Sequence, residues 1–485
     1  MNRKLIIKTI LMLILILGVA MLPAAAVSLA CHEMKVAAGI GITSLGLMIF
    51  SGISLFFVRP TSSTLKPREG FLVVTACWFL ASVAGSLPFL ISGYTHSVTD
   101  AFFESCASIT TTGATIMDLQ IIPRGLLLWK AVMQWLGGMG ILVFVISILP
   151  MMGISGQNLF RAESSSVKMA GRISDSAKVL YGTYLTLTFS EFVLLVLGGM
   201  SVFDAVINTM SSVSTSGVFI HSGGLEYYNS VFIESVIAFF TVAVSVNFTS
   251  YHSIVNKKYR EFFTEEIKVF LSIIMVASIM IATNLLYYHH YDTFGETIRC
   301  SFFQVTAIAT TTGYSTATYT DWPSFSKFIL FALFFIGGCT TSTSGSIKVA
   351  RIIIAFKLVG RNIYQRLHPR AVVAVKIGRK AVPANVVSWT TSYIFLFILT
   401  FIVGSLVLSL QGLDLKTTIS ASISMLSNTG LAFGAIGSAG NFSIFGTPLR
   451  MFLCFLMFLG RLELFTVLIL FTPAYWHPDK TKTSV

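Results

Sequence analysis

The chain has 485 residues, of which 54% are hydrophobic and only 11% are charged, whereas soluble domains usually carry about 25% charged residues. This composition excludes a soluble globular protein and indicates a polytopic membrane protein. The net charge of +13 does not indicate nucleic-acid binding, because 25 of the 33 lysines and arginines fall in segments that one topology places in the cytoplasm. The six cysteines have no paired spacing, and we interpret them as small core residues.

The first predicted element is an apolar run over residues 5–29, which is long enough to cross a bilayer. Pro23-Ala24-Ala25-Ala26 resembles the small-residue end of a signal peptide, so cleavage is the alternative. The run is longer than the hydrophobic region of most signal peptides, and we therefore predict a retained helix. A second spanning helix follows over residues 36–58.

Four pairs of predicted spans come next. The pairs are 70–93 with 125–150, 179–200 with 229–255, 267–288 with 323–357, and 385–410 with 445–472. Ten spans place both termini in the cytoplasm, in agreement with the basic residues. We expect two leading helices in 1–69 and four repeats in 70–178, 179–266, 267–384 and 385–485.

Each pair of spans encloses a Ser/Thr-rich run that ends in one glycine. The runs are 108–113, 211–217, 308–313 and 425–430, and their glycines are spaced by 104, 96 and 117 residues. The segment before each glycine is too short for a span, which needs about 20 residues. We predict a half-helix that enters the membrane from outside, stops midway and returns as extended chain. Asp100 and Asp204 both lie thirteen residues before a glycine, where a carboxylate favours the positive end of a helix.

Irregular backbone at membrane depth is tolerated only where protein buries it or where it lines a water-filled cavity. Four such loops on one axis could replace the hydration shell of a cation with carbonyl oxygens. Glycine suits a turn with positive φ and leaves room where a Cβ would not fit. The alternative is that the Ser/Thr-Gly clusters merely pack helices. Four copies in the same setting favour the pore.

Several motifs resemble those of the Trk/Ktr/HKT superfamily of potassium transporters, which have four span–pore helix–span repeats. Besides the runs that end in Gly113, Gly313 and Gly430, they are Gln134-Trp135-Leu136-Gly137-Gly138-Met139-Gly140, Leu159-Phe160-Arg161-Ala162-Glu163 and Gly460-Arg461-Leu462-Glu463. The resemblance covers residues 70–472, and the two leading helices resemble the Trk branch. The resemblance implies an all-α membrane protein with a pseudo-fourfold pore and two further N-terminal helices.

The resemblance also implies potassium uptake across a bacterial cytoplasmic (inner) membrane, with K⁺ as the transported ion and no cofactor bound by this chain. The implied filter residues are Thr111, Thr112, Gly113, Thr215, Ser216, Gly217, Thr311, Thr312, Gly313, Asn428, Thr429 and Gly430. The second run is the least regular, so its register stays open. A channel-type Gly-Tyr-Gly is absent, and we expect fewer defined ion sites than in a potassium channel.

A gate is expected below the filter. The second span of repeat three contains Gly337-Gly338-Cys339-Thr340-Thr341-Ser342-Thr343-Ser344-Gly345, a composition that sustains a helix poorly. It resembles the family's intramembrane loop that obstructs the pore; the alternative is a kinked helix. Arg461 is intramembrane, where an arginine usually faces a cavity. Arg461 follows Gly430 by 31 residues, as Ser344 follows Gly313, so both are expected at one depth. The expected gate residues are Gly337, Gly338, Thr343, Ser344, Gly345 and Arg461.

The resemblance further implies a homodimer and a cytosolic nucleotide-binding regulatory subunit, and this chain has no nucleotide motif of its own. A cation symporter of the same fold, which moves K⁺ with H⁺ or Na⁺, is the alternative function. An enzyme is not expected. Gly153-Ile154-Ser155-Gly156 resembles a serine-protease motif, but no histidine is expected at its level.

Overall fold

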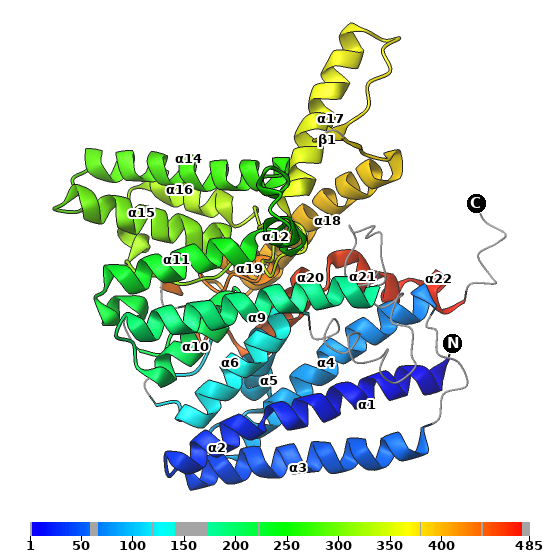
Figure 1. Ribbon diagram of the computed structural model, residues 1–485, viewed down its shortest axis with the longest axis vertical. Helices are drawn as coiled ribbons and strands as arrows, with labels where there is room; N and C mark the ends of the chain where they lie inside the picture. The colour runs from blue at the N-terminus through cyan, green and yellow to red at the C-terminus, as the bar shows by residue number, and fades with distance from the viewer. Residues whose placement is uncertain are drawn as a thin grey trace.

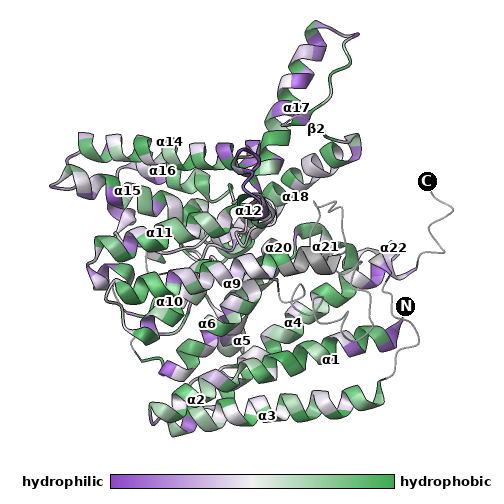
Figure 2. Ribbon diagram, in the orientation of Figure 1, coloured by the Kyte–Doolittle hydropathy of each residue, from purple (hydrophilic) through white to green (hydrophobic). Residues whose placement is uncertain are grey.

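The computed structural model describes residues 2–58, 66–118, 121–140, 173–221, 224–378, 380–437 and 440–477 of the chain. The described part is a bundle of helices whose long axes run broadly alongside one another, with one helix projecting beyond the rest (Figure 1). Hydrophobic residues predominate along most of the helices (Figure 2). This is the pattern of a chain whose outer surface faces lipid rather than water.

The leading helices pack as one layer at the edge of the bundle. They are α1 (Arg3–Ala20), α2 (Leu22–Ala30) and α3 (Met34–Phe57). α1 and α2 together form one apolar span of 28 residues. The Ser44 hydroxyl of α3 donates to the Gly18 carbonyl of α1 at 2.7 Å, and a Cβ on Gly18 would lie 2.8 Å from Met48 Cγ. The predicted first helix is therefore closely packed on its neighbour.

Four span–pore helix–span repeats follow. Their first spans are α4 (Pro67–Ile91), α9 (Ile173–Leu197), α14 (Glu265–Tyr287) and α18 (Ala384–Ser409). Their pore helices are α5 (Val98–Ile109), α10 (Val202–Val213), α15 (Phe294–Ala309) and α19 (Leu415–Ser427). The pore helices have 12 to 16 residues, as predicted for half-helices. Each begins within a few residues of the end of its first span, and we call the side on which they begin the pore-helix face.

The second spans differ from the prediction, because the last three of the four are each divided into two helices in the described residues. They are α6 (Arg124–Gly138), α11 (Val231–Ser245) with α12 (Phe248–Val255), α16 (Ser324–Leu333) with α17 (Val349–Leu367), and α20 (Thr447–Arg461) with α21 (Leu464–Leu468). The chain bends by 100° between α11 and α12 and by 115° between α20 and α21. Only the third break was expected.

Local sequence explains two of these breaks. Asn247 accepts a hydrogen bond at its side chain from Thr249 N–H and so starts α12 as its N-cap. Glu463 lies at φ +59°, in the left-handed region, and so ends the helix that contains Arg461. Six described helices are long and apolar enough to cross a membrane, and the two bent pairs raise this number to eight. The other two predicted spans are 125–150, which continues from α6 into undescribed residues, and the interrupted 323–357.

The remaining described elements are short. They are α13 (Tyr259–Phe262), α22 (Pro473–Trp476), the 3-10 turns η2 (Gly224–Tyr228), η3 (Tyr319–Asp321) and η5 (Ile469–Phe471), and a hairpin of β1 (Lys376–Ile377) and β2 (Lys380–Ala381).

A buried ion pair fixes the first pore helix. Lys130 Nζ of α6 lies 2.5 Å from Glu104 Oε2 of α5, and both side chains are at most 1% exposed. Glu104 Oε1 also accepts hydrogen bonds from the Thr115 hydroxyl at 2.7 Å and the Ile116 N–H at 2.8 Å. One carboxylate therefore joins α5, α6 and the chain that leaves the first glycine loop. Neither residue was singled out from the sequence, although two opposite charges in apolar segments were a visible signal.

Lys130→Met leaves the Glu104 carboxylate buried without its cation. Breaking a buried pair from one side costs about 3–5 kcal/mol, so we expect a clear loss of thermal stability for the detergent-purified protein. Glu104→Gln combined with Lys130→Met removes the stranded charge and keeps an acceptor for Ile116 N–H, so it should regain part of that loss. A single variant as stable as the wild type would show that the pair does not contribute.

Candidate functional site

The four pore helices end in loops that share one backbone conformation. Each loop has two residues with positive φ, in the left-handed region: a Thr or Asn, and a glycine two positions later. The φ pairs are Thr111 +54° and Gly113 +74°, Thr215 +54° and Gly217 +62°, Thr311 +57° and Gly313 +74°, and Asn428 +56° and Gly430 +79°. A non-glycine residue rarely adopts positive φ, so four equivalent cases indicate a shared structural requirement.

One residue lies between these two, and its backbone N–H donates a hydrogen bond to the pore helix that precedes the loop. Thr112 N–H donates to Ala107 O at 2.9 Å, and the same bond recurs in the other loops at 2.9, 2.9 and 3.0 Å, from Ser216 to Ser211, Thr312 to Ala307 and Thr429 to Ser424. Because the helix ends satisfy these amides, the loop carbonyls do not have to pair with them.

The glycines lie against the backbone of the next loop in a closed cycle. A Cβ built on each would lie within about 2 Å of a neighbouring carbonyl oxygen: 1.7 Å from Gly113 to Ser216, 2.0 Å from Gly217 to Thr312, 1.9 Å from Gly313 to Thr429, and 2.1 Å from Gly430 to Thr112. A real Cβ does not approach a backbone oxygen so closely. The four loops therefore surround one axis in chain order, and each of the four positions requires glycine on steric grounds as well as for its φ.

The second loop is the irregular one, as its sequence suggested. In the other three loops, hydroxyl groups two residues apart bond each other: Thr110 with Thr112 at 2.9 Å, Thr310 with Thr312 at 2.7 Å, and Ser427 with Thr429 at 2.7 Å. In the second loop, Ser214 bonds the Ser211 carbonyl instead, and the Ser216 hydroxyl has no hydrogen-bond partner among the described residues. The backbone of Thr215, Ser216 and Gly217 nevertheless matches that of its counterparts.

Capping side chains hold the start of each pore helix. Ser97, Ser201, Thr293 and Asp414 each accept a hydrogen bond from the backbone N–H three residues on. A hydrogen bond from the Thr417 hydroxyl lowers the pKa of the Asp414 carboxyl.

The two aspartates predicted near these helix starts each lie beside a basic side chain. Asp100 Oδ1 lies 2.6 Å from Arg450 Nη1 of α20, which ties the first pore helix to the fourth repeat. Asp204 Oδ2 lies 3.3 Å from His221 Nε2.

A loop of residues 334–348, which we call the interrupting loop, separates α16 from α17. Gly345 N–H donates to the Thr311 hydroxyl at 2.7 Å, and a Cβ on Gly345 would lie 2.1 Å from Ser427 O. Gly337 N–H bonds Ile347 O at 2.9 Å, which closes the base of the loop. The interrupting loop thus packs directly against the third and fourth glycine loops.

Arg461 joins three parts of the chain at the end of α20. Its guanidinium donates to Thr343 O at 2.7 Å in the interrupting loop and to Gly137 O at 2.5 Å and Gly138 O at 3.0 Å at the end of α6. The residue that it bonds, Thr343, is next to Ser344, so the structure brings together the two positions that the glycine offsets placed at one depth.

Two further side chains, which sequence reasoning missed, also hold the interrupting loop. The Lys348 ammonium donates to the carbonyls of Ser342 and Ser344. Glu266 of α14 accepts from Thr340 N–H at 2.6 Å and from the Thr340 hydroxyl at 2.9 Å.

Further contacts come from the two bent second spans. Asn247 Oδ1 accepts from the Thr341 hydroxyl at 2.5 Å, and Arg351 pairs with Glu463 at 2.8 Å. A lysine at the end of the loop and polar residues at the helix breaks were the available signals. The sequence motifs 153–156 and 159–163 lie outside the described residues.

Comparisons with known proteins agree with this geometry. The sequence pattern of the TrkH family, described as "Cation transport protein", matches residues 38–478. The chain is 35% identical to the "Trk system potassium uptake protein TrkH" of Vibrio parahaemolyticus over 98% of this chain and 100% of that protein. It is 32% identical to the Escherichia coli "Trk system potassium uptake protein TrkG" over 90% of this chain and 91% of the relative.

Solved structures agree as well. The crystal structure of the potassium transporter TrkH from Vibrio parahaemolyticus superimposes with a TM-score of 0.88 at 33% sequence identity, and covers 98% of this chain and 100% of that one. The match extends over the leading helices and all four repeats. The chain therefore belongs to the TrkH family of cation transport proteins.

Proposed function

We propose that this protein takes up potassium through the axis on which the four glycine loops meet. The closed cycle of glycine and carbonyl contacts is the observation that carries the proposal, because it gathers backbone oxygens from four repeats around one line. The relatives named for potassium uptake support K⁺ as the ion. K⁺ is the cargo here, and the proposal needs no bound cofactor and no enzymatic step.

The proposed filter comprises three residues of each loop. They are Thr111, Thr112 and Gly113; Thr215, Ser216 and Gly217; Thr311, Thr312 and Gly313; and Asn428, Thr429 and Gly430. The pore helices point their C-terminal ends toward this site, and the negative end of a helix dipole favours a cation. The glycine in the first loop, Gly113, also favours potassium, because a larger residue there would displace the carbonyl of the second loop.

The proposed gate comprises Gly337, Gly338, Thr343, Ser344, Gly345 and Arg461. The interrupting loop contacts two of the four glycine loops, so it lies where it can obstruct one end of the axis. Arg461 holds the loop by its Thr343 carbonyl and adds a fixed positive charge. Lys348, the last residue of the loop, donates to the carbonyls of Ser342 and Ser344 within it. Release of these carbonyls would let the loop move away from the filter.

The proposed setting is a bacterial inner membrane, with both termini in the cytoplasm and the intramembrane interrupting loop on the cytoplasmic side of the filter. The uneven distribution of lysine and arginine supports this orientation, which places the pore-helix face outside. The repeat boundaries at residues 70, 179, 267 and 385 stay part of the proposal. A cytosolic nucleotide-binding subunit is the proposed regulator, acting through the basic segments between repeats.

A homodimer is proposed as the assembly. α17 projects beyond the bundle (Figure 1). Phe356, Val359, Ile363 and Leu367 form an exposed apolar row at helical spacing along it. The Glu265 carboxylate at the start of α14 pairs with Lys357, which ties the middle of α17 to the bundle. An apolar row on a helix beyond the bundle is suited to a second copy of the same helix.

Gly113→Asp should abolish rescue of a potassium-uptake-deficient bacterium at low potassium, because the side chain enters the carbonyl ring. Gly412→Asp is the matched control: its φ of +75° is nearly the same, and nothing lies within 4 Å of its Cβ position. The control should grow like the wild type. Equal rescue by both variants would exclude the ring as the ion path.

Arg461→Ala should raise the basal potassium flux into proteoliposomes severalfold, because a hydrogen bond from a charged group contributes about 1.5–3 kcal/mol. Arg461→Lys, which keeps the charge but loses the double donor, should give an intermediate flux. Arg260→Ala, at an exposed arginine, serves as control. Unchanged flux and regulation in Arg461→Ala would rule out its role in the gate. Reversal potentials in the same vesicles separate a uniporter from a symporter.

Phe356→Asp with Ile363→Asp should convert the purified dimer to monomers, because two charges interrupt the apolar row. Mass measurement of the detergent-purified protein reads the oligomeric state. Asn362→Asp, an exposed position on the same helix, should leave the dimer intact. A dimer that survives the double substitution places the interface elsewhere.

A further inference from the structure

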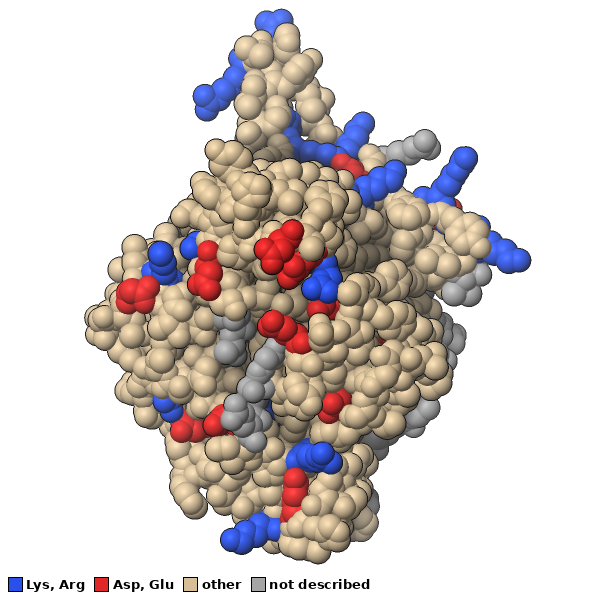
Figure 3. All heavy atoms as spheres, turned by 90° about the vertical axis from the view of Figure 1, so that its left-hand side faces the viewer, with Lys and Arg blue, Asp and Glu red and all other residues tan. Residues whose placement is uncertain are grey.

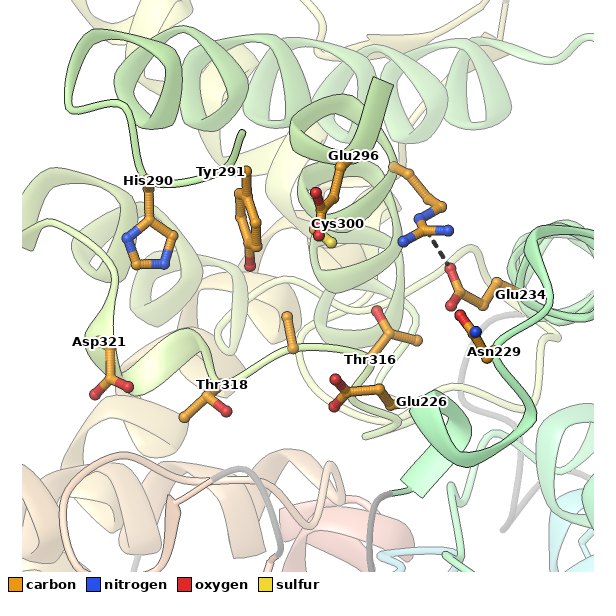
Figure 4. A pocket seen from close by; sticks show the side chains of 12 residues that line it. Glu226, Asn229, Glu234, His290, Tyr291, Glu296, Cys300, Thr316, Thr318 and Asp321 are labelled. Atoms are coloured by element: carbon orange, nitrogen blue, oxygen red, sulfur yellow. Dashed lines mark ion pairs between the residues drawn. The ribbon is translucent and has the colours of Figure 1, made fainter. Parts of the chain in front are cut away.

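An acidic cavity of about 340 Å³ opens on the pore-helix face, between the second and third repeats. Three segments line it: residues 226–234, which lead into α11; residues 290–300, from the turn after α14 into α15; and residues 316–321, which follow the third glycine loop. Figure 4 shows side chains from all three pointing into the same space. Figure 3, which views the molecule from this side, shows acidic side chains gathered near its centre.

The cavity carries an excess of negative charge. Its wall includes four carboxylates, Glu226, Glu234, Glu296 and Asp321, and one guanidinium, that of Arg299. Arg299 Nε lies 3.4 Å from Glu234 Oε2, so these two largely offset each other. The other three carboxylates have no basic partner in the part of the chain that the structure describes, which leaves the cavity with three negative charges.

A buried hydroxyl faces the same space. Thr316 is 8% exposed, lines the cavity, and its hydroxyl has no hydrogen-bond partner among the described residues. Buried hydroxyl groups are nearly always hydrogen-bonded, so this one is available to a ligand or to its water shell. Thr316 follows Gly313 by only three residues, which places this wall of the cavity at the end of the third glycine loop.

We propose that the cavity binds a hydrated monovalent cation beside the outer end of the filter and so supplies K⁺ to the pore. The cation keeps its water shell because no group of three His, Cys, Asp or Glu side chains in the described residues is placed to hold a metal directly. The volume accommodates an ion with six or seven waters, which occupy about 200 Å³ in the liquid. The proposal rests on the function proposed above, with ions entering from the pore-helix face.

The electrostatic argument gives the size of the effect. At a separation of about 10 Å in water, one unit charge changes the affinity for a monovalent cation about twofold. Removing two carboxylates should therefore weaken cation capture about fourfold at low salt. The interaction is screened, because the Debye length falls from about 30 Å at 0.01 M salt to about 10 Å at 0.1 M.

The test is potassium uptake into proteoliposomes at about 10 mM choline chloride, where screening is weak, and at about 200 mM, where it is strong. Glu226→Gln with Glu296→Gln should raise the KM for K⁺ about fourfold at low salt, leave the maximal rate unchanged, and converge with the wild type at high salt. Thr316→Val should also raise KM, although it changes no charge.

Asp292→Asn is the matched control. Asp292 is exposed on the same turn between α14 and α15 but does not line the cavity, so its removal should shift KM by less than 1.5-fold. An unchanged KM in the double variant overturns the inference. A KM shift that persists at high salt also overturns it, and so does an equal shift in Asp292→Asn. Absent uptake by the wild type in the same assay would instead refute the proposed function.

Discussion

The structure depends on the close approach of backbone to backbone where the four glycine loops meet. Each glycine leaves space for the carbonyl of the next loop, and the cycle closes only if all four positions lack a Cβ. Every nearby element serves this contact. The pore helices satisfy the loop amides, N-caps start those helices, and the Glu104–Lys130 pair holds the chain after the first loop. A membrane offers no water to such irregular backbone, so protein must supply every partner.

The four repeats serve the ring unequally. The first loop, the third and the fourth brace themselves with paired hydroxyls, whereas the second relies on its pore helix. The interrupting loop contacts the third and fourth loops. This asymmetry separates the two tasks of the chain: the common backbone of all four loops forms the ring, and the divergent second spans form the structure beneath it.

Positive and negative side chains lie on opposite sides of the ring. Below the ring, Lys348 and Arg461 donate to carbonyls of the interrupting loop, so positive charge and loop backbone stabilise each other. On the pore-helix face, carboxylates line a cavity that adjoins the third glycine loop. Along the proposed ion path, a cation would meet negative charge on one side of the ring and fixed positive charge on the other, an arrangement that favours capture before passage.

The sequence by itself determined the class of the protein, the four repeats and the glycine positions. Those features follow from local rules: length and hydropathy define spans, and a glycine in a polar run marks positive φ. The offset argument even paired Arg461 with the interrupting loop. The tertiary structure decided which loop touches which, where the second spans break, and how Glu104 meets Lys130. These depend on contacts between residues far apart in the chain, such as Arg461 with Gly137, and no local pattern specifies the partner of a buried charge.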